Sequence, residues 1–316
     1  MEEVFSKVKK EVGKIIVGHQ EIIDGVVRGI LANGHVLIEG VPGIAKTLLI
    51  RALAVAVGCE FSRIQFTVDL LPSDILGLTT YTPGKGFSTV KGPIFANFII
   101  ADEINRAPSK TQSALLEAMQ ERQVTIGKRT FPLPKPFFVM ANNNPLESSG
   151  TYPLPEAQID RFLFKLKMMY TSLDDEKIIL DQNITIYEFE DFKINKVVNA
   201  SIINKMQEKT RNVKASDKLK DYIIKLVAAT RNPDKYGIKL GKYIEWGGSP
   251  RAGISLFIGA KADAFMHGKE FATPQNVKNV AKDALRHRII LNYLGQAEKI
   301  RTDDIVQEIL DKVETY

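Results

Sequence analysis

The sequence predicts an α/β protein in which a mainly parallel β-sheet comes first and a smaller helical domain follows. In the first 170 residues short apolar runs alternate with amphipathic stretches, and from about Leu173 onward helical periodicity replaces them. Hydrophobic residues make up 44% of the 316-residue chain, which is enough for two cores. We therefore expect two domains, residues 1–172 and 173–316.

Five apolar runs are the predicted strands of the sheet. Their length, and their position between helical patterns, are typical of buried parallel strands. In chain order these runs are residues 35–39, 61–66, 97–101, 137–141 and 162–168.

Two segments interrupt this alternation and predict β-hairpins. Residues 79–90 place a Pro-Gly pair between β-prone flanks, and residues 123–133 place a Gly-Lys pair in the same way. Between them, Ser109 and Gln112 have the spacing of a capping box. This spacing predicts a helix that begins there and runs to about Arg122.

Charge argues against a nucleic-acid partner. The 43 basic and 37 acidic side chains give a net charge of +6. Residues 1–170 hold 19 basic and 16 acidic side chains and the remainder holds 24 and 21, so each part carries +3. The chain has no basic arm and no aromatic-rich basic stripe, so we do not expect it to bind nucleic acid.

Cysteine content and hydropathy favour a cytoplasmic protein. Cys59 is the single cysteine, so no intramolecular disulfide can form, and four scattered histidines without a second thiol make no metal-ligand cluster. No stretch approaches 18 uncharged apolar residues, and the N-terminal residues lack an apolar export signal. We expect neither export nor a membrane span.

Residues 40–47, GVPGIAKT, predict a phosphate-binding loop between the first strand and a helix. In such a loop backbone N–H groups turn toward the phosphates, and the following helix adds the positive end of its dipole. Lys46 would reach the β and γ phosphates and Thr47 would bind Mg²⁺. Ala45 stands where the general pattern has glycine. A glycine-containing turn with an exposed lysine is the alternative.

Asp102 and Glu103 end the apolar run of the third predicted strand. An aspartate there can hold Mg²⁺ through water, and the adjacent glutamate can activate the water that attacks the γ-phosphate. An acidic pair at a helix start is the alternative, since the helix dipole favours it. The position at a strand end, downstream of Lys46, favours the catalytic interpretation.

These segments resemble the MoxR family of AAA+ ATPases, in the helix-2-insert branch that also holds a magnesium chelatase subunit and the MCM helicases. The resemblance implies a five-stranded AAA+ core with two β-hairpin insertions and a C-terminal helical lid. Alanine at the position of Ala45 is usual in that family, whereas Val68 replaces an expected proline and Asn142-Asn143 replace Thr-Gln. The matching segments are residues 16–20, 40–47, 63–77, 92–127, 151–162 and 247–252.

The resemblance assigns a role to several further residues. One of the three asparagines at 142–144 resembles sensor 1, and Asn144 is preferred because it precedes Pro145. Arg161 resembles an arginine finger that acts on a neighbouring subunit, and Arg251 resembles sensor 2, acting in cis or in trans. The implied catalytic residues are Glu103, Asn144, Arg161 and Arg251. The implied nucleotide-binding residues are Ile16, Val17, Gly40, Val41, Pro42, Gly43, Ile44, Ala45, Lys46, Thr47, Leu48 and Asp102, with Thr47 and Asp102 on the metal.

The function implied by the resemblance is Mg²⁺-dependent ATP hydrolysis by a homo-oligomeric ring, expected to be hexameric, with a chaperone-like action on protein clients. Such clients often include proteins with von Willebrand factor A domains. One alternative is an MCM-like nucleic-acid motor, whose hairpin residues would be Lys85, Phe87, Lys128 and Arg129. The other is a scaffold that binds ATP without hydrolysing it.

Overall fold

The computed structural model describes residues 2–41, 43–143, 151–182 and 188–315. At its centre lies a five-stranded sheet in the order β2-β5-β8-β1-β9, and all four neighbouring pairs are parallel. The five predicted strands are confirmed, with ends that shift by one or two residues. They are β1 (Val36–Gly40), β2 (Phe61–Gln65), β5 (Phe98–Asp102), β8 (Phe138–Asn143) and β9 (Phe164–Met168).

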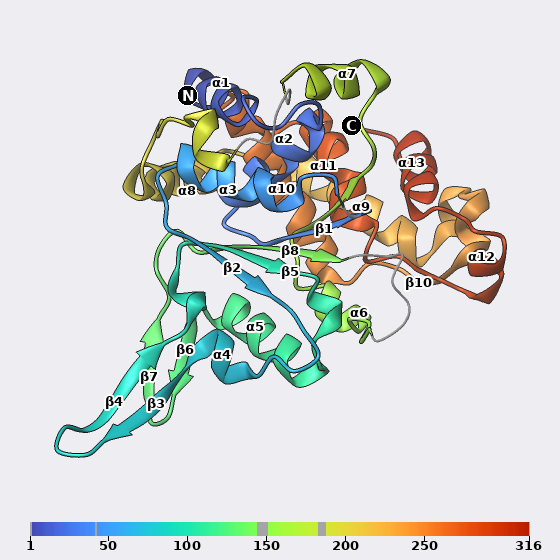
Figure 1. Ribbon diagram of the computed structural model, residues 1–316. Coiled ribbons are helices and arrows are strands. Elements are labelled where there is room, and N and C mark those ends of the chain that lie inside the picture. Colours follow the sequence, from blue (N-terminus) through green and yellow to red (C-terminus); the bar gives the residue numbers. More distant parts are fainter. Residues whose placement is uncertain (1, 42, 144–150, 183–187, 316) are drawn as a thin grey trace.

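Helices cover both faces of this sheet (Figure 1). Along each strand alternate side chains enter opposite cores: Ile38 and Ile100 pack on the side of α2, α3 and the later helices, whereas Leu37 and Ile99 pack on the side of α5. The helices around the sheet are α1 (Glu2–Val12), α2 (Gln20–Leu31), α3 (Lys46–Ala56), α4 (Pro72–Leu76), α5 (Ser109–Glu121), α6 (Glu156–Ile159) and α7 (Leu173–Gln182).

A helical lid follows, as the change of periodicity predicts. Its helices are α8 (Ala200–Asn212), α9 (Asp217–Arg231), α10 (Pro250–Met266), α11 (Pro274–Leu285), α12 (Tyr293–Ala297) and α13 (Thr302–Lys312). A short antiparallel pair, β10 (Ile244–Trp246) with β11 (Ile290–Leu291), adds a feature that the helical pattern does not predict. None of the described helices combines the length and apolar character that a membrane-spanning helix needs.

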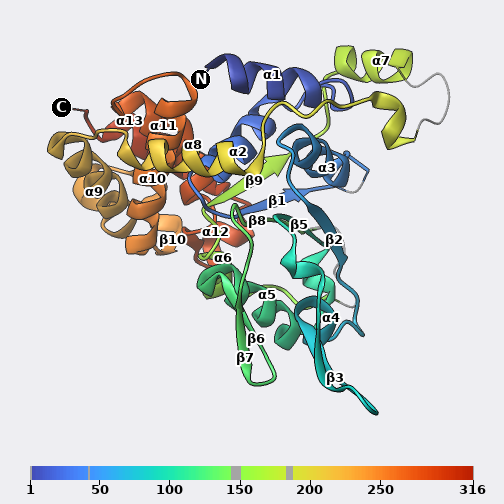
Figure 2. The ribbon, with the colours of Figure 1, turned by 90° about the vertical axis from the view of Figure 1, so that its left-hand side faces the viewer.

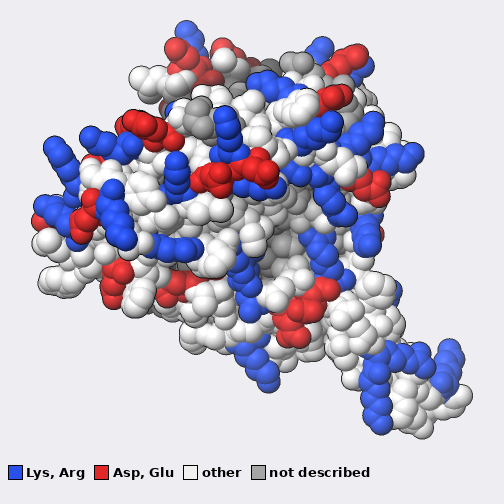
Figure 3. Space-filling model, turned by 180° about the vertical axis from the view of Figure 1, so that it is seen from behind, with Lys and Arg blue, Asp and Glu red and all other residues white. Residues whose placement is uncertain are grey.

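Both predicted hairpins are confirmed, and they project together from one end of the molecule (Figure 2). The first pairs β3 (Gly77–Thr82) with β4 (Gly86–Lys91), and the second pairs β6 (Gln123–Ile126) with β7 (Arg129–Pro132). Neither hairpin contains an Asp or Glu. The projecting end therefore shows Lys and Arg, whereas both signs of charge mix over the rest of the face in Figure 3.

The capping box predicted before α5 is wrong, although the helix is present. Pro108 occupies the N-cap position and Ser109 is the first helical residue, so no side chain caps the helix. Gln112 is instead fully buried, and its amide donates to the carbonyl oxygens of Ala107 and Tyr152 at 3.0 and 2.8 Å. Gln112 thus stabilises the preceding loop, because a buried amide must find partners.

The lid is joined to the sheet side through a buried carboxylate on α10. Asp263 is completely buried and forms an ion pair with Arg28 of α2, with 2.7 Å between Oδ1 and Nε. The amides of Asn276 and Asn279 on α11 donate to its second oxygen at 2.8 and 2.9 Å. These contacts compensate the buried charge and fix α2, α10 and α11 to one another.

A buried histidine precedes β1. His35 donates from Nε2 to the carbonyl of Met119 at 3.1 Å, and its Nδ1 accepts from the backbone N–H of Val139 at 3.0 Å. Burial, and then the nearby charge of Arg122, lower the pKa of His35 to about 3. The folded protein therefore holds this ring neutral at pH values where the unfolded chain protonates it.

We predict that His35 makes stability depend on pH between about 3 and 6.5. In this window the unfolded chain binds the extra proton, so the free energy of unfolding falls as pH falls, by up to about 1.4 kcal/mol per pH unit. His35→Gln keeps an N–H donor and an oxygen acceptor without titrating. Urea unfolding at pH 7 to 4.5 should show a smaller loss for this variant than for the parent. Equal pH dependence of the two proteins would contradict the assignment.

Candidate functional site

Two residues in the described part of the turn between β1 and α3 have a left-handed backbone conformation. Gly43 has a φ of 82° and Ala45 a φ of 59°, both in the left-handed region. A side chain at Gly40 would place its Cβ 2.5 Å from the carbonyl oxygen of Met168, so close strand packing demands glycine there. Ala45 adopts this left-handed conformation although it costs a residue other than glycine about 1–2 kcal/mol. Of the predicted loop residues, Pro42 lies outside the described part of the chain.

Lys46 and Thr47 begin α3 and face a cleft of about 410 Å³. Lys46 is buried, and its Nζ donates to the carbonyl oxygen of Gly40 at 2.7 Å. Burial lowers the pKa of Lys46, while the carboxylates of Asp102 and Glu103 act in the opposite direction. The Lys46 ammonium group lines the cleft, where it could exchange the carbonyl oxygen of Gly40 for a phosphate oxygen.

Asp102, at the end of β5, collects contacts from three other elements. Thr47 Oγ1 lies 3.4 Å from its Oδ2, and Arg63 Nε on β2 donates to the same oxygen at 2.9 Å. The Asn142 amide on β8 donates to Oδ1. Because β2 and β8 flank β5, the sheet brings these side chains to one edge. Thr47 and Asp102 could thus hold a divalent cation jointly with substrate and water oxygens.

Glu103 is held beside this cluster. Its φ is 56°, and its backbone N–H donates to Asn142 Oδ1 at 2.6 Å. Its Oε2 accepts from Gln65 Nε2 at 2.8 Å and lies 3.2 Å from Arg106 Nε. Both side-chain contacts use one carboxylate oxygen of Glu103, which lines the cleft. The sequence analysis did not single out Gln65 or Arg106.

One sequence signal could have identified Arg63, which contacts Asp102, and Gln65, which contacts Glu103. Arg63 and Gln65 alternate with Ile64 in β2, and Ile64 is buried. Two polar side chains on one face of a strand next to the acidic strand end are placed to contact it. In the register of the sheet Gln65 lies beside Asp102, which agrees with this expectation.

A second hollow of about 420 Å³ adjoins the cleft and shares Gly43, Ala45 and Leu48 with it. Ile16 and Val17 line this hollow, as expected for residues beside an adenine ring. Ile44 also lines it, whereas Val41 lies with Gly40 in a different hollow. Aromatic residues outside the sequence analysis add to the lining; these are Tyr170, Phe189 and Phe192.

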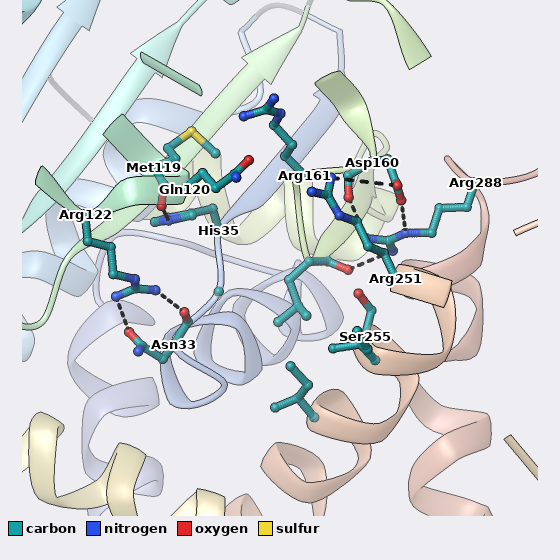
Figure 4. A pocket seen from close by; sticks show the side chains of 14 residues that line it. Asn33, His35, Met119, Gln120, Arg122, Asp160, Arg161, Arg251, Ser255 and Arg288 are labelled. Atoms are coloured by element: carbon teal, nitrogen blue, oxygen red, sulfur yellow. Dashed lines mark hydrogen bonds and ion pairs between the residues drawn. The ribbon is translucent and has the colours of Figure 1, made fainter. Parts of the chain in front are cut away.

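Arg161 and Arg251 lie together, but in a third cavity of about 260 Å³ that shares no lining residue with the cleft (Figure 4). Arg251 Nη1 is 3.9 Å from Asp160 Oδ2. Arg251 therefore faces the segment that carries Arg161 rather than the turn between β1 and α3 of its own chain. In Figures 1 and 2, α6 before Arg161 lies well apart from α3. The fourth predicted catalytic residue, Asn144, lies outside the described residues.

Among the described residues, no group of three or more His, Cys, Asp or Glu side chains is placed to hold a metal ion. A cation bound through one carboxylate, one hydroxyl and substrate phosphates does not need such a group.

Two models of known protein families match this chain, one in its α/β core and one in its helical lid. Residues 35–164 match the family model described as "ATPase family associated with various cellular activities (AAA)", and residues 241–309 match the AAA lid domain. The fold and the cleft thus define an AAA ATPase.

Relatives that match over nearly the whole chain narrow this class. The chain is 44% identical to Chaperone MoxR1 of Mycobacterium tuberculosis, over 96% of this chain and 80% of that protein. It is 41% identical to YeaC of Bacillus subtilis, over 98% and 94% of the two chains. A crystal structure of a candidate ATPase from Cytophaga hutchinsonii matches with a TM-score of 0.91 and 46% identity, over 100% of this chain and 96% of that one. The chain belongs to the MoxR family of AAA ATPases.

We predict that Lys46→Ala weakens ATP binding about 10- to 100-fold, because a charge-assisted hydrogen bond contributes about 1.5–3 kcal/mol. Titration with a fluorescent ATP analogue would measure the change. Lys110→Ala is the matched control, since Lys110 is exposed on α5 and lines neither the cleft nor the adjoining hollow. Unchanged affinity in Lys46→Ala would exclude Lys46 from phosphate binding.

Proposed function

We propose that this protein hydrolyses ATP with Mg²⁺ at the contacts of a homo-oligomeric ring and uses the cycle to remodel protein complexes. One observation supports this proposal above the others. Lys46, Thr47, Asp102 and Glu103 meet in one cleft, whereas Arg161 lines a separate cavity. An arginine finger that is remote from its own cleft can act only on a neighbouring copy.

In the proposed reaction the chain positions ATP before it acts on water. Ile16 and Val17 contact the adenine, the loop amides from Gly40 to Leu48 enclose the phosphates, and Lys46 binds the β and γ phosphates. Thr47 and Asp102 would hold Mg²⁺, since Thr47 Oγ1 and Asp102 Oδ2 lie 3.4 Å apart, close enough to bind the same cation. When bound, Mg²⁺ supplies neutralisation of charge on the phosphates.

Glu103 then accepts a proton from the attacking water. The contacts with Gln65 and Arg106 both use Oε2, which leaves Oε1 to accept the proton. Asn144 remains our proposal for sensor 1. Asn142 supports the same end of the cleft, because its amide contacts both Asp102 and the backbone of Glu103.

Arg161 and Arg251 complete the site of the next subunit. A contact of this kind joins two different faces of identical chains, and such contacts close into rings when the rotation permits. We propose a ring of six copies. The shared cavity of the two arginines supports a common action in trans for Arg251 as well as for Arg161.

The chaperone-like action rests on the relative named Chaperone MoxR1 and on the resemblance of the chain to its family. We propose protein clients, including proteins with von Willebrand factor A domains. The projecting hairpins offer a surface for clients, since Tyr81 and Phe87 are 63% and 80% exposed at the end of the first hairpin.

We predict that Glu103→Gln binds ATP like the parent and loses hydrolysis by about 10²- to 10⁴-fold, the usual contribution of a general base. Glutamine preserves the shape and the contact with Gln65 but does not accept the proton. Nucleotide titration and steady-state phosphate release would measure the two effects, and pull-down with this variant would recover clients that bind the ATP state. Hydrolysis at the parent rate would remove Glu103 from its assigned role.

The trans role of Arg161 predicts complementation between two inactive proteins. Arg161→Ala keeps its own cleft but supplies no finger, and Glu103→Gln supplies a finger but activates no water. Mixing them should restore hydrolysis where an intact cleft meets an intact finger. Arginine fingers contribute about 10³- to 10⁵-fold in rate, so a minority of repaired contacts is measurable. If mixed rings form and stay inactive, Arg161 does not act in trans.

A nucleic-acid motor is the second candidate function. The basic hairpins favour it, since Lys85, Lys91, Lys128 and Arg129 lie on them and neither hairpin contains an Asp or Glu. Over the rest of the face in Figure 3 the two signs of charge are mixed, and few phosphate counterions would be displaced there. The joint presence of Asp102, Glu103 and Arg161 argues against the other alternative, a scaffold without hydrolysis.

We predict that neither single-stranded nor duplex DNA stimulates the ATPase at physiological salt. Phosphate release with and without DNA, repeated at low and high salt, would measure this. Several-fold stimulation that disappears as salt rises would favour the motor over the remodelling function.

A further inference from the structure

We propose that Arg288 is a positioning residue for Arg161. Arg288 holds the residues on both sides of Arg161 and thereby fixes the direction in which the finger leaves the chain. The inference rests on the proposed trans role of Arg161 and deepens it, because it names the group that makes the finger rigid.

The contacts of Arg288 use its whole guanidinium group. An arginine has five N–H donors, and here each of them has an acceptor. Nε donates to Asp160 Oδ1 at 2.7 Å, and Nη2 donates to the carbonyl oxygens of Asp160 and Phe162 at 3.0 and 2.7 Å. Nη1 donates to the carbonyl oxygen of Leu163 at 3.2 Å and to that of Ala284. Three of the four residues that it holds belong to the short segment around Arg161.

Because Arg288 is buried, each of its N–H groups needs an acceptor within the protein. The Arg288 side chain is 2% exposed, so any N–H group without an acceptor would cost free energy. Asp160 supplies the opposite charge, and the carbonyl oxygens supply the remaining acceptors. A planar fork with fixed directions satisfies all of them at once, whereas a flexible ammonium group does not.

Arg161 itself is exposed and depends on this support. Among the described residues, no carboxylate lies within ion-pair distance of its guanidinium group. In Figure 4 the side chains of Arg251 and Arg288 point toward Asp160, while Arg161 points away from it. The backbone that Arg288 fixes therefore sets the starting direction of the Arg161 side chain. An arginine finger with a fixed orientation stabilises the charge that develops on the phosphoryl group better than a mobile arginine does.

Arg288 also connects the finger to the lid. It lies between α11 and β11, within the part that matches the AAA lid domain, whereas Arg161 lies in the part that matches the AAA core. Two more lid residues contact the segment: His287 Nε2 donates to the carbonyl of Phe162 at 3.2 Å, and Ser249 Oγ donates to Asp160 Oδ2 at 3.1 Å. A movement of the lid is thereby transmitted to the finger that serves the neighbouring subunit.

The test uses Arg288→Lys in the full chain. Lysine keeps the charge but has three donors and no fork. We expect ATP affinity equal to that of the parent and a kcat lowered about 10- to 100-fold, the effect of a misplacement of about 1 Å. Mixing with Glu103→Gln should restore hydrolysis, because the variant keeps an intact cleft and receives an intact finger. Mixing with Arg161→Ala should restore nothing, because both proteins then lack a functional finger.

Arg286→Lys is the matched control. Arg286 lies two residues earlier and its side chain is 8% exposed, but its contacts are Asp283, Asp303 and the carbonyl of Lys165. This change should lower thermal stability as Arg288→Lys does while leaving kcat close to that of the parent. A loss of kcat as large as that of Arg288→Lys would show that any disturbed lid contact impairs catalysis, which would overturn the specific role.

Asp160→Asn repeats the test from the other side of the contact, and it serves if Arg288→Lys does not fold. If either folded variant hydrolyses ATP at the parent rate, the positioning role is overturned. It is also overturned if both variants are inactive and Glu103→Gln does not restore them, while it does restore Arg161→Ala. If neither variant folds, the contact is a folding requirement and the proposal fails. If Arg161→Ala itself is not restored within mixed rings, the trans function fails instead.

Discussion

The carboxylate of Asp102 joins the elements that form the proposed nucleotide cleft. It lies at the end of β5, where Thr47 from α3, Arg63 from β2 and Asn142 from β8 contact it. A buried carboxylate is stable only when it is paired and hydrogen-bonded, so these contacts hold the charge as well as the geometry. The negative charge also acts on Lys46, which burial would otherwise push toward the neutral form.

Local patterns account for the parts of the molecule that the sequence predicts. The strands, the hairpins, the phosphate loop and the acidic pair each occupy a few consecutive residues, so their spacing carries the information. The capping box at Ser109 failed because Pro108 fits the N-cap position, while the fold buries Gln112 elsewhere. Contacts such as Arg288 with Asp160 join residues far apart in the chain, and no local period marks them.

Two buried ion pairs join the lid to different parts of the core. The buried pair of Arg28 with Asp263 ties α10 to α2, on the face that carries α3 and the phosphate loop. The contact of Arg288 with Asp160 ties the end of α11 to the segment of Arg161. Both contacts join the lid to the core through buried charges, so a rotation of the lid against the core would have to break them or move the contacted core segments with it.

The strand order also determines when the nucleotide cleft can form during synthesis. β1 lies between β8 and β9 in the sheet, with Val36 beside both Met140 and Phe164. Roughly 100 residues must therefore be made after β1 before its first neighbour exists, and such long-range pairing slows folding. In that interval the apolar β1 has no partner strand, which is the condition under which nascent chains aggregate. β1 therefore has both of its neighbours in the sheet only once β9 has been made.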